Sequence, residues 1–163
     1  MTGSQVYREA AALGLLAGLR SMSAPALITR VARRGQLAAK GSKLEFLNST
    51  GALAGAIVLA AGEIVVDKLP KTPARIKPGP LTARAVSGAL CGAILCSARK
   101  KSPWLGALYG ALGAVGATYA AYHLRHAVKE TLHVPDAVVA VAEDAVVAGS
   151  GFLIASRLTD QLA

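Results

Sequence analysis

Apolar residues follow one another along this chain in five long runs, which short polar and basic stretches separate. The clearest run, Ser102–Leu124, contains 23 residues without a formal charge. As a helix it would be about 34 Å long, enough to cross a hydrocarbon core of about 30 Å. Because a helix of a soluble bundle keeps a polar face and this run has none, a membrane helix is the better interpretation.

The pattern predicts one all-α domain over residues 1–163, a polytopic membrane helix bundle of about five helices. We expect these helices to cover residues 8–31, 46–68, 80–99, 102–126 and 136–158. Composition agrees, since 53% of the residues are hydrophobic and only 17% are charged, whereas a soluble domain usually has about 25% charged residues.

A short phrase of glycine, alanine and leucine recurs in four of the runs, as LGLLAGL, GALAGAI, GALCGAI and GALYGAL. Each copy places two glycines four residues apart, so that both lie on one face of a helix. Lipid supplies little hydrophobic drive for helices to associate, whereas small residues at this spacing let two backbones approach closely. We expect helix packing at Gly14, Gly18, Gly51, Gly55, Gly88, Gly92, Gly106, Gly110 and Gly113.

The other four runs contain charged residues, each of which costs about 2.5–3.5 kcal/mol at the centre of a membrane helix unless it is partnered or hydrated. We expect ion pairs between Arg84 and Glu63, and between Arg20 and either Glu143 or Asp144. One interpretation is a polar site or an ion relay inside the membrane. The other is charge pairs that fix helix register, or charges that snorkel to a nearby surface. On the first interpretation the path residues are Arg20, Ser21, Ser23, Glu63, Asp67, Arg84, Glu143 and Asp144.

Two proline-containing stretches interrupt the pattern. In RSMSAPAL, residues 20–27, Pro25 disrupts the first helix near its middle. A discontinuous helix there would expose backbone amides beside Arg20, a natural site for an anion or a headgroup, whereas a plain proline kink is the alternative. The stretch DKLPKTPARIKPGPL, residues 67–81, predicts a stiff basic loop at the headgroup level, with Arg75 and Lys77 available to phosphates.

Some runs resemble one another. Leu13–Gly18 is similar to Leu105–Gly110, and Ala60–Val66 is similar to Ala140–Val146, which would relate helices 1–2 to helices 4–5 as an inverted repeat. Chance similarity in a chain of biased composition is the alternative. If all five helices span, the loops carry nine basic residues on one side and eight, including Arg8, on the other. The positive-inside rule then assigns no orientation, and we expect dual insertion.

Other classes of function find little support. The net charge of +9 would suit nucleic acid, but the basic residues cluster between apolar runs, as in membrane-flanking loops. The chain has no nucleotide-binding loop, HExxH, nucleophile elbow or CxxC pair, and His123 and His126 lack a third ligand nearby. We therefore expect no enzyme activity, no cofactor and no metal, and we expect Cys91 and Cys96 to be small buried hydrophobes.

Three stretches resemble the domain-of-unknown-function 4126 family of small bacterial membrane proteins: GLRSMSAPAL, AGEIVVDKLPKTPARIKPGPLTARAVSGALCGA and the closing AEDAVVAG. The resemblance covers about residues 9–157. It implies a helical protein in a membrane, and no reaction. We expect a multi-pass protein of the inner (cytoplasmic) membrane.

The leading functional hypothesis is an oligomeric transporter or channel-like path for an ion or a small solute, with buried charges near the midplane. The alternative is a structural or lipid-interacting membrane protein without transport activity. The expected partners are the lipid bilayer and further copies of the same chain. Water that reaches the buried charges would favour transport, and charges sealed within helix contacts would favour the alternative.

Overall fold

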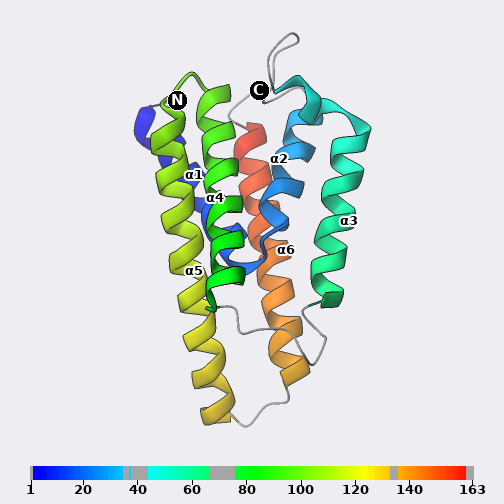
Figure 1. The fold of residues 1–163 in the computed structure, drawn as a ribbon, viewed down its shortest axis with the longest axis vertical. Helices are drawn as coiled ribbons and strands as arrows, with labels where there is room; N and C mark the ends of the chain where they lie inside the picture. Colours follow the sequence, from blue (N-terminus) through cyan, green and yellow to red (C-terminus); the bar gives the residue numbers. More distant parts are fainter. Residues whose placement is uncertain (1, 35–36, 38–43, 67–75, 133–135, 161–163) are drawn as a thin grey trace.

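The computed structural model describes residues 2–34, 37, 44–66, 76–132 and 136–160, and the regular elements in these ranges are all helices. This confirms the all-α fold. The described part of the chain forms α1 (Gly3–Leu19), α2 (Ser23–Arg33), the short 3-10 helix η1 (Glu45–Asn48), α3 (Thr50–Val66), α4 (Pro78–Ala98), α5 (Pro103–Leu132) and α6 (Asp136–Asp160). They lie side by side in an elongated bundle (Figure 1).

Three helices, α1, α4 and α5, make the most extensive contacts of the bundle with one another. Their glycines face the neighbouring backbone. A Cβ placed at Gly92 would overlap the Gly106 carbonyl, and a Cβ at Gly110 would lie 2.7 Å from the carbonyl carbon of Gly88. Both distances are below van der Waals contact, so these glycines permit a helix separation that alanine would not. The same closeness at the other positions confirms the packing expected for Gly14, Gly18, Gly88, Gly92, Gly106, Gly110 and Gly113.

The same prediction is wrong, within this chain, for the glycines of α3. A Cβ at Gly55 would meet nothing within 4 Å, and one at Gly51 would meet only the Ser49 hydroxyl at 4.0 Å. Both glycines are exposed. The spacing of the two glycines sets the face on which they lie, but a close contact also needs a helix opposite that face.

The first apolar run is two helices instead of the single helix expected at residues 8–31. Arg20 has an extended backbone, with φ −144° and ψ 121°, and ends α1. After a turn the chain folds back as α2, towards the end of the bundle where α1 begins (Figure 1). Pro25 is the third residue of α2, where its missing N–H interrupts no helical hydrogen bond. The discontinuous helix, not the plain kink, is therefore present.

This hairpin corrects the expected distribution of charge. The start of α1 and the end of α6 lie at the same end of the bundle (Figure 1), so Arg8 does not belong with the opposite loops. Among the described residues, this terminal end carries eight basic residues: Arg8, Arg30, Arg33, Arg34, Arg99, Lys100, Lys101 and Arg157. The helix ends opposite carry Lys77 and Arg125, and Lys68, Lys71 and Arg75 lie outside the described residues. Moving Arg8 to the terminal end changes the division expected from the sequence from nine and eight to ten and seven.

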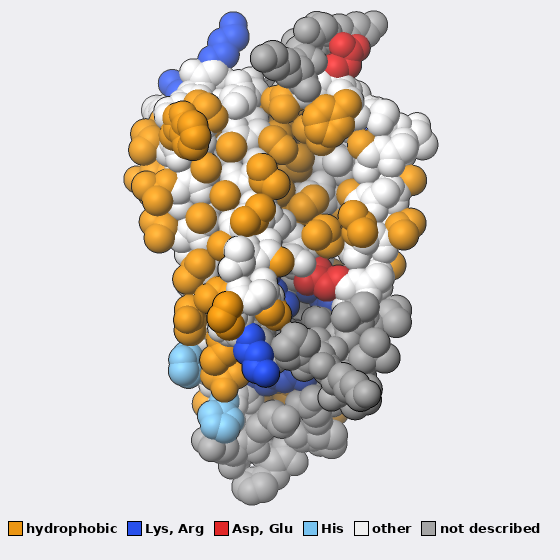
Figure 2. Space-filling model, viewed as in Figure 1, with side chains coloured by type: hydrophobic (Ala, Val, Ile, Leu, Met, Phe, Trp, Pro, Cys, Tyr) orange, Lys and Arg blue, Asp and Glu red, His pale blue; other side chains and the backbone are white. Residues whose placement is uncertain are grey.

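Large apolar side chains lie on the outside of the bundle. Exposed examples occur on α1, α3, α4, α5 and α6, among them Val58, Leu90, Leu112 and Phe152. Figure 2 shows hydrophobic side chains over most of one face, with basic side chains near the upper end and in the lower third. Among the described helices, α4 is long and apolar enough to cross a membrane by length and composition, and the apolar part of α3, Thr50–Glu63, is shorter.

Candidate functional site

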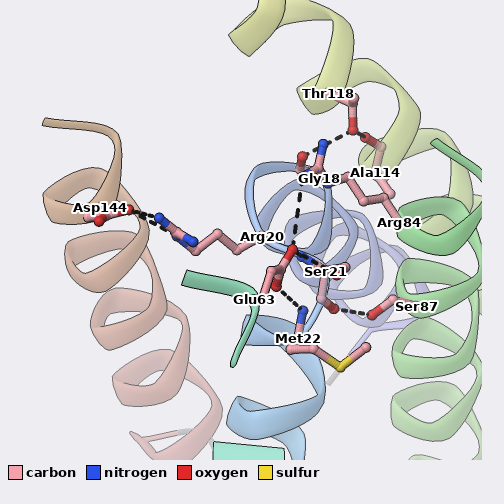
Figure 3. A network of polar contacts seen from close by, with 10 residues as sticks. All are labelled: Gly18, Arg20, Ser21, Met22, Glu63, Arg84, Ser87, Ala114, Thr118 and Asp144. Atoms are coloured by element: carbon pink, nitrogen blue, oxygen red, sulfur yellow. Dashed lines mark hydrogen bonds and ion pairs between the residues drawn. The ribbon is translucent and has the colours of Figure 1, made fainter. Parts of the chain in front are cut away.

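The turn between α1 and α2 lies inside the bundle and holds a carboxylate from α3 (Figure 3). The backbone N–H and the hydroxyl of Ser21 each donate to Oε1 of Glu63, both at 2.8 Å. The backbone N–H of Met22 donates to Oε2 of the same carboxylate at 2.9 Å. We call Arg20, Ser21 and Met22 the hairpin tip. Its amides are thus occupied by an acid that is more than forty residues away in sequence.

The local sequence explains why these amides are available. Once Arg20 leaves the helical conformation, the N–H groups of Ser21 and Met22 have no helical carbonyl to bind, whereas the N–H of Ser23 donates to the Arg20 carbonyl at 3.2 Å. The start of a helix also carries partial positive charge, which favours an anion. The sequence-based expectation of exposed amides beside Arg20 is therefore confirmed, and the anion that binds them is the chain's own Glu63.

Two buried arginines, one of them Arg20 itself, form ion pairs at the hairpin tip. The guanidinium Nη2 of Arg84 lies 3.9 Å from Oε1 of Glu63, and the Arg84 side chain is 4% exposed. On the other side, Nε of Arg20 donates to Oδ1 of Asp144 at 2.9 Å, and Nη2 of Arg20 contacts the same oxygen. Both ion pairs expected from the sequence are present, and Asp144 is a partner of Arg20. The side chain of Glu143 lies outside the described part of the chain.

Two hydroxyl groups that the sequence analysis did not select bind the carbonyls around the break. Ser87 of α4 donates to the carbonyl of Ser21. Thr118 of α5, which is fully buried, donates to the carbonyl of Gly18 at 3.0 Å and to that of Ala114 at 2.8 Å. A sequence signal did exist, because Thr118 continues at a spacing of four residues the small-residue face of Gly110 and Ala114.

The other expected site residues lie elsewhere. Ser23 is the first residue of α2 and lines a groove between α2, α3 and α6. Lys77 precedes the first turn of α4 and is exposed. Asp67 and Arg75 lie outside the described residues. The site that the structure assembles therefore consists of the hairpin tip, Glu63, Arg84, Ser87, Thr118 and Asp144 (Figure 3).

Around Glu63 the arrangement is chemically an anion site. Two N–H groups, one hydroxyl and one guanidinium converge on a single carboxylate. These groups are hydrogen-bond donors and a fixed cation, so they stabilise negative charge. Within the described ranges, no group of three His, Cys, Asp or Glu side chains is placed to hold a metal ion.

Comparison with curated proteins found no match, and comparison with solved structures found none. A family model does match, over residues 9–156, and its description is Domain of unknown function (DUF4126). The match covers the hairpin tip, Glu63, Arg84, Ser87, Thr118 and Asp144. Because it spans most of the 163 residues, the chain belongs to this family of domains of unknown function, DUF4126.

Proposed function

We propose that the chain is an integral membrane protein of the inner (cytoplasmic) membrane, and that it provides a path for a small anion. The membrane placement is supported by the outward-facing apolar side chains, of which Val58, Leu90 and Phe152 are 68%, 58% and 73% exposed. Buried polar groups, in contrast, gather at the hairpin tip. This distribution is the reverse of that in a soluble helical bundle.

The satisfied backbone at the hairpin tip also fits a membrane interior. In hydrocarbon an unpaired N–H or C=O costs several kcal/mol, so non-helical backbone occurs there only where protein or a water-filled cavity surrounds it. Here Glu63 binds two N–H groups, while Ser87 and Thr118 bind two carbonyls. Given the eight basic residues at the terminal end, the positive-inside rule favours the cytoplasmic side for both termini.

One observation carries the proposal of an anion path: a carboxylate sits on the open amides of a broken helix. An anion that displaced Glu63 would meet the same donors from Ser21 and Met22, and the Arg84 guanidinium beside them. The substrate class is then a small inorganic anion or a small carboxylate, which resembles the end of the Glu63 side chain. Broken helices serve as binding elements in many transporters for this physical reason.

The expected inverted repeat remains a prediction. Its first half contains the hairpin tip, whereas α5, the proposed counterpart of the first helix, runs without a break from Pro103 to Leu132. Assembly with copies of the same chain is likewise a proposal. Its support is that α3 turns an apolar face outward, with Ile57, Val58 and Leu59 more than half exposed.

A second candidate is a structural or lipid-interacting membrane protein without transport activity. One observation favours it: the charges at the hairpin tip are nearly sealed, since the side chains of Arg20, Arg84 and Glu63 are 9%, 4% and 13% exposed. Only Asp144, at 33%, is substantially accessible. On this interpretation the ion pairs and hydrogen bonds hold the hairpin in place and conduct nothing.

Thiol accessibility separates the two candidates. Cys91 and Cys96 are replaced by alanine, and Ser21→Cys is exposed in native membranes to a charged, membrane-impermeant thiol reagent. The anion path predicts labelling that formate slows, and faster labelling when Glu63→Ala is added, because the carboxylate no longer covers the tip. Complete protection of Ser21→Cys in a folded protein, with and without Glu63→Ala, would exclude the path and leave the second candidate.

Two further single cysteines calibrate this measurement. Thr2→Cys, exposed at the terminal end, should be labelled fully. Val58→Cys is 68% exposed on the outer face of α3, yet lipid should protect it. If Val58→Cys reacts as fast as Thr2→Cys, the membrane placement is wrong.

Transport itself is measured in proteoliposomes that contain a chloride-sensitive dye. We expect chloride uptake above that of protein-free vesicles, and we expect formate to compete with it. In Glu63→Ala the uptake rate should change by about tenfold or more, since each tenfold corresponds to only about 1.4 kcal/mol at the site. Glu45→Ala, which removes an exposed acid of η1, is the matched control. Uptake that equals the protein-free rate for both small anions would contradict the proposal.

A further inference from the structure

A groove with a volume of about 610 Å³ runs along α2, between α3 and α6. α2 forms its floor and contacts both flanking helices, whereas among the described residues α3 and α6 make no close backbone contact with each other. Leu27 lies on the floor, and Leu53 and Val147 line the two walls. The two lips carry Ile57 of α3 and Phe152 of α6, which are 53% and 73% exposed.

The groove changes character along its length. Its middle is apolar, but Arg30 and Arg34 line one end, at the C-terminal end of α2. Ser23 lines the other end, at the start of α2 and next to the hairpin tip. Ser23 and Arg34 are eleven positions apart in the chain, which places these ends about 16 Å apart along a helix. The groove is thus long and apolar, with two cationic side chains at one end.

We infer that this groove binds one anionic phospholipid, with an acyl chain along α2 and the phosphate at Arg30 and Arg34. The inference rests on the membrane placement proposed above and is independent of anion transport. A guanidinium is a strong partner for phosphate, because its donors match two phosphate oxygens. The apolar walls match the acyl chain, which passes from the hydrocarbon of the bilayer into the groove without contact with water.

Three features favour a lipid over a helix of a second copy. The guanidinium pair lies at the terminal end, where eight described basic residues would meet the headgroups. A groove between two helices that do not meet opens sideways, so in a bilayer lipid chains reach it directly. Finally, two cationic side chains at the end of an apolar groove complement an amphiphile with an anionic headgroup, whereas the apolar face of a second helix would leave both charges unpaired.

Fluorescence quenching by brominated lipids tests this site. Trp104, the sole tryptophan, is replaced by phenylalanine, and Phe152→Trp places a single reporter on a lip of the groove. A second reporter, Leu112→Trp, lies on the outer face of α5, where Leu112 is 60% exposed and away from the groove. The full chain is reconstituted in phosphatidylcholine vesicles, with bromine on the acyl chains of either phosphatidylcholine or phosphatidylglycerol.

We expect the Phe152→Trp reporter to prefer phosphatidylglycerol by about twenty-five-fold, since phosphatidylcholine is zwitterionic and each basic side chain near an anionic headgroup contributes a factor of about five. The Leu112→Trp reporter should show little preference. The double change Arg30→Gln and Arg34→Gln should abolish the preference at the groove. Arg33→Gln with Lys100→Gln removes two charges from the same end, outside the groove lining, and should retain it.

Three results would overturn the inference. Equal quenching by both lipids at Phe152→Trp would exclude the anionic-lipid site. Absence of quenching there, while Leu112→Trp is quenched, would mean that protein, such as a second copy, fills the groove. Absence of quenching at Leu112→Trp would refute the membrane placement itself. The lipid site depends on that placement and would be refuted as well. Loss of chloride transport alone would leave the lipid site intact.

Discussion

The glycines of α5 allow a direct test of the helix packing. Gly110 and Gly116 lie on the same helix, but only Gly110 faces a neighbouring backbone. The change in each case is a single methyl group, Gly110→Ala or Gly116→Ala. An exposed helix would gain from either change, since alanine favours the helix over glycine by about 0.5–1 kcal/mol.

The expected magnitude follows from the distances at the two positions. The methyl carbon of Gly110→Ala would lie 2.7 Å from the Gly88 carbonyl carbon and 3.3 Å from the Ala89 nitrogen. Both atoms belong to the α4 backbone, so the helices must move apart. Overpacking of this kind costs about 1–3 kcal/mol. At Gly116 nothing lies within 4 Å of the added carbon, and only the gain in helix propensity remains.

Thermal unfolding in dilute detergent, followed by circular dichroism, measures the difference. For a chain of this size, about 1 kcal/mol shifts Tm by about 2–4 °C. Gly110→Ala should therefore lower Tm by about 2–12 °C, a range that combines the overpacking cost with this slope. Gly116→Ala should leave Tm unchanged or raise it by about 1–4 °C.

Equal shifts for the two variants would refute the close approach of α4 and α5. Gly55→Ala extends the test, because Gly55 stands in the same recurring phrase as Gly110 but has no neighbour within 4 Å. It should behave as Gly116→Ala does when the protein is monomeric. A large loss at Gly55 would mean that the phrase marks packing wherever it occurs, contrary to the structure.

Three further predictions concern the hairpin. The losses of stability in Arg84→Ala and Glu63→Gln should be non-additive by about 0.5–3 kcal/mol in a double-mutant cycle, and simple addition would contradict the ion pair. Thr118→Val should lower the free energy of unfolding by about 1 kcal/mol or more, because it leaves the Gly18 carbonyl unpaired. Ser150→Ala removes a hydroxyl that bonds within its own helix and should change stability little. Equal melting points for the two variants would exclude the contact between Thr118 and Gly18. Side-specific reporters fused to the two termini should report the same side of the membrane, and opposite sides would refute a hairpin of α1 and α2 within the bilayer.

Much of the site could be inferred from residue type and spacing. Arg84 precedes Gly88 by one helical turn, so the small-residue face already placed its charge in a helix interface, where it is 4% exposed. Pro25 indicated an interruption of the first run, and it lies in the first turn of α2, where its missing N–H costs no helical hydrogen bond. Because buried charges need partners, the sequence predicted that Arg84 pairs with Glu63 and that Arg20 pairs with an acid of the last helix.

Other features depended on neighbours that a linear pattern does not contain. The break near Pro25 was foreseeable, but the reversal of direction that makes α2 antiparallel to α1 was not. That reversal changes the side on which the N-terminus lies, and therefore the number of basic residues on each side. Thr118 shows the same limit, since a hydroxyl within an apolar run signals polarity but does not name the carbonyl that it will bind.

The sequence by itself determined that the regular elements are helices, which faces their small residues occupy and that the first apolar run is interrupted between Arg20 and Pro25. These are local properties, set by the helical period and by proline. Only the tertiary structure decided what meets those groups: Glu63 on the amides, Gly88 against Gly110, and no helix against Gly55. Such contacts join segments far apart in the chain, and their geometry follows from the packing of whole helices.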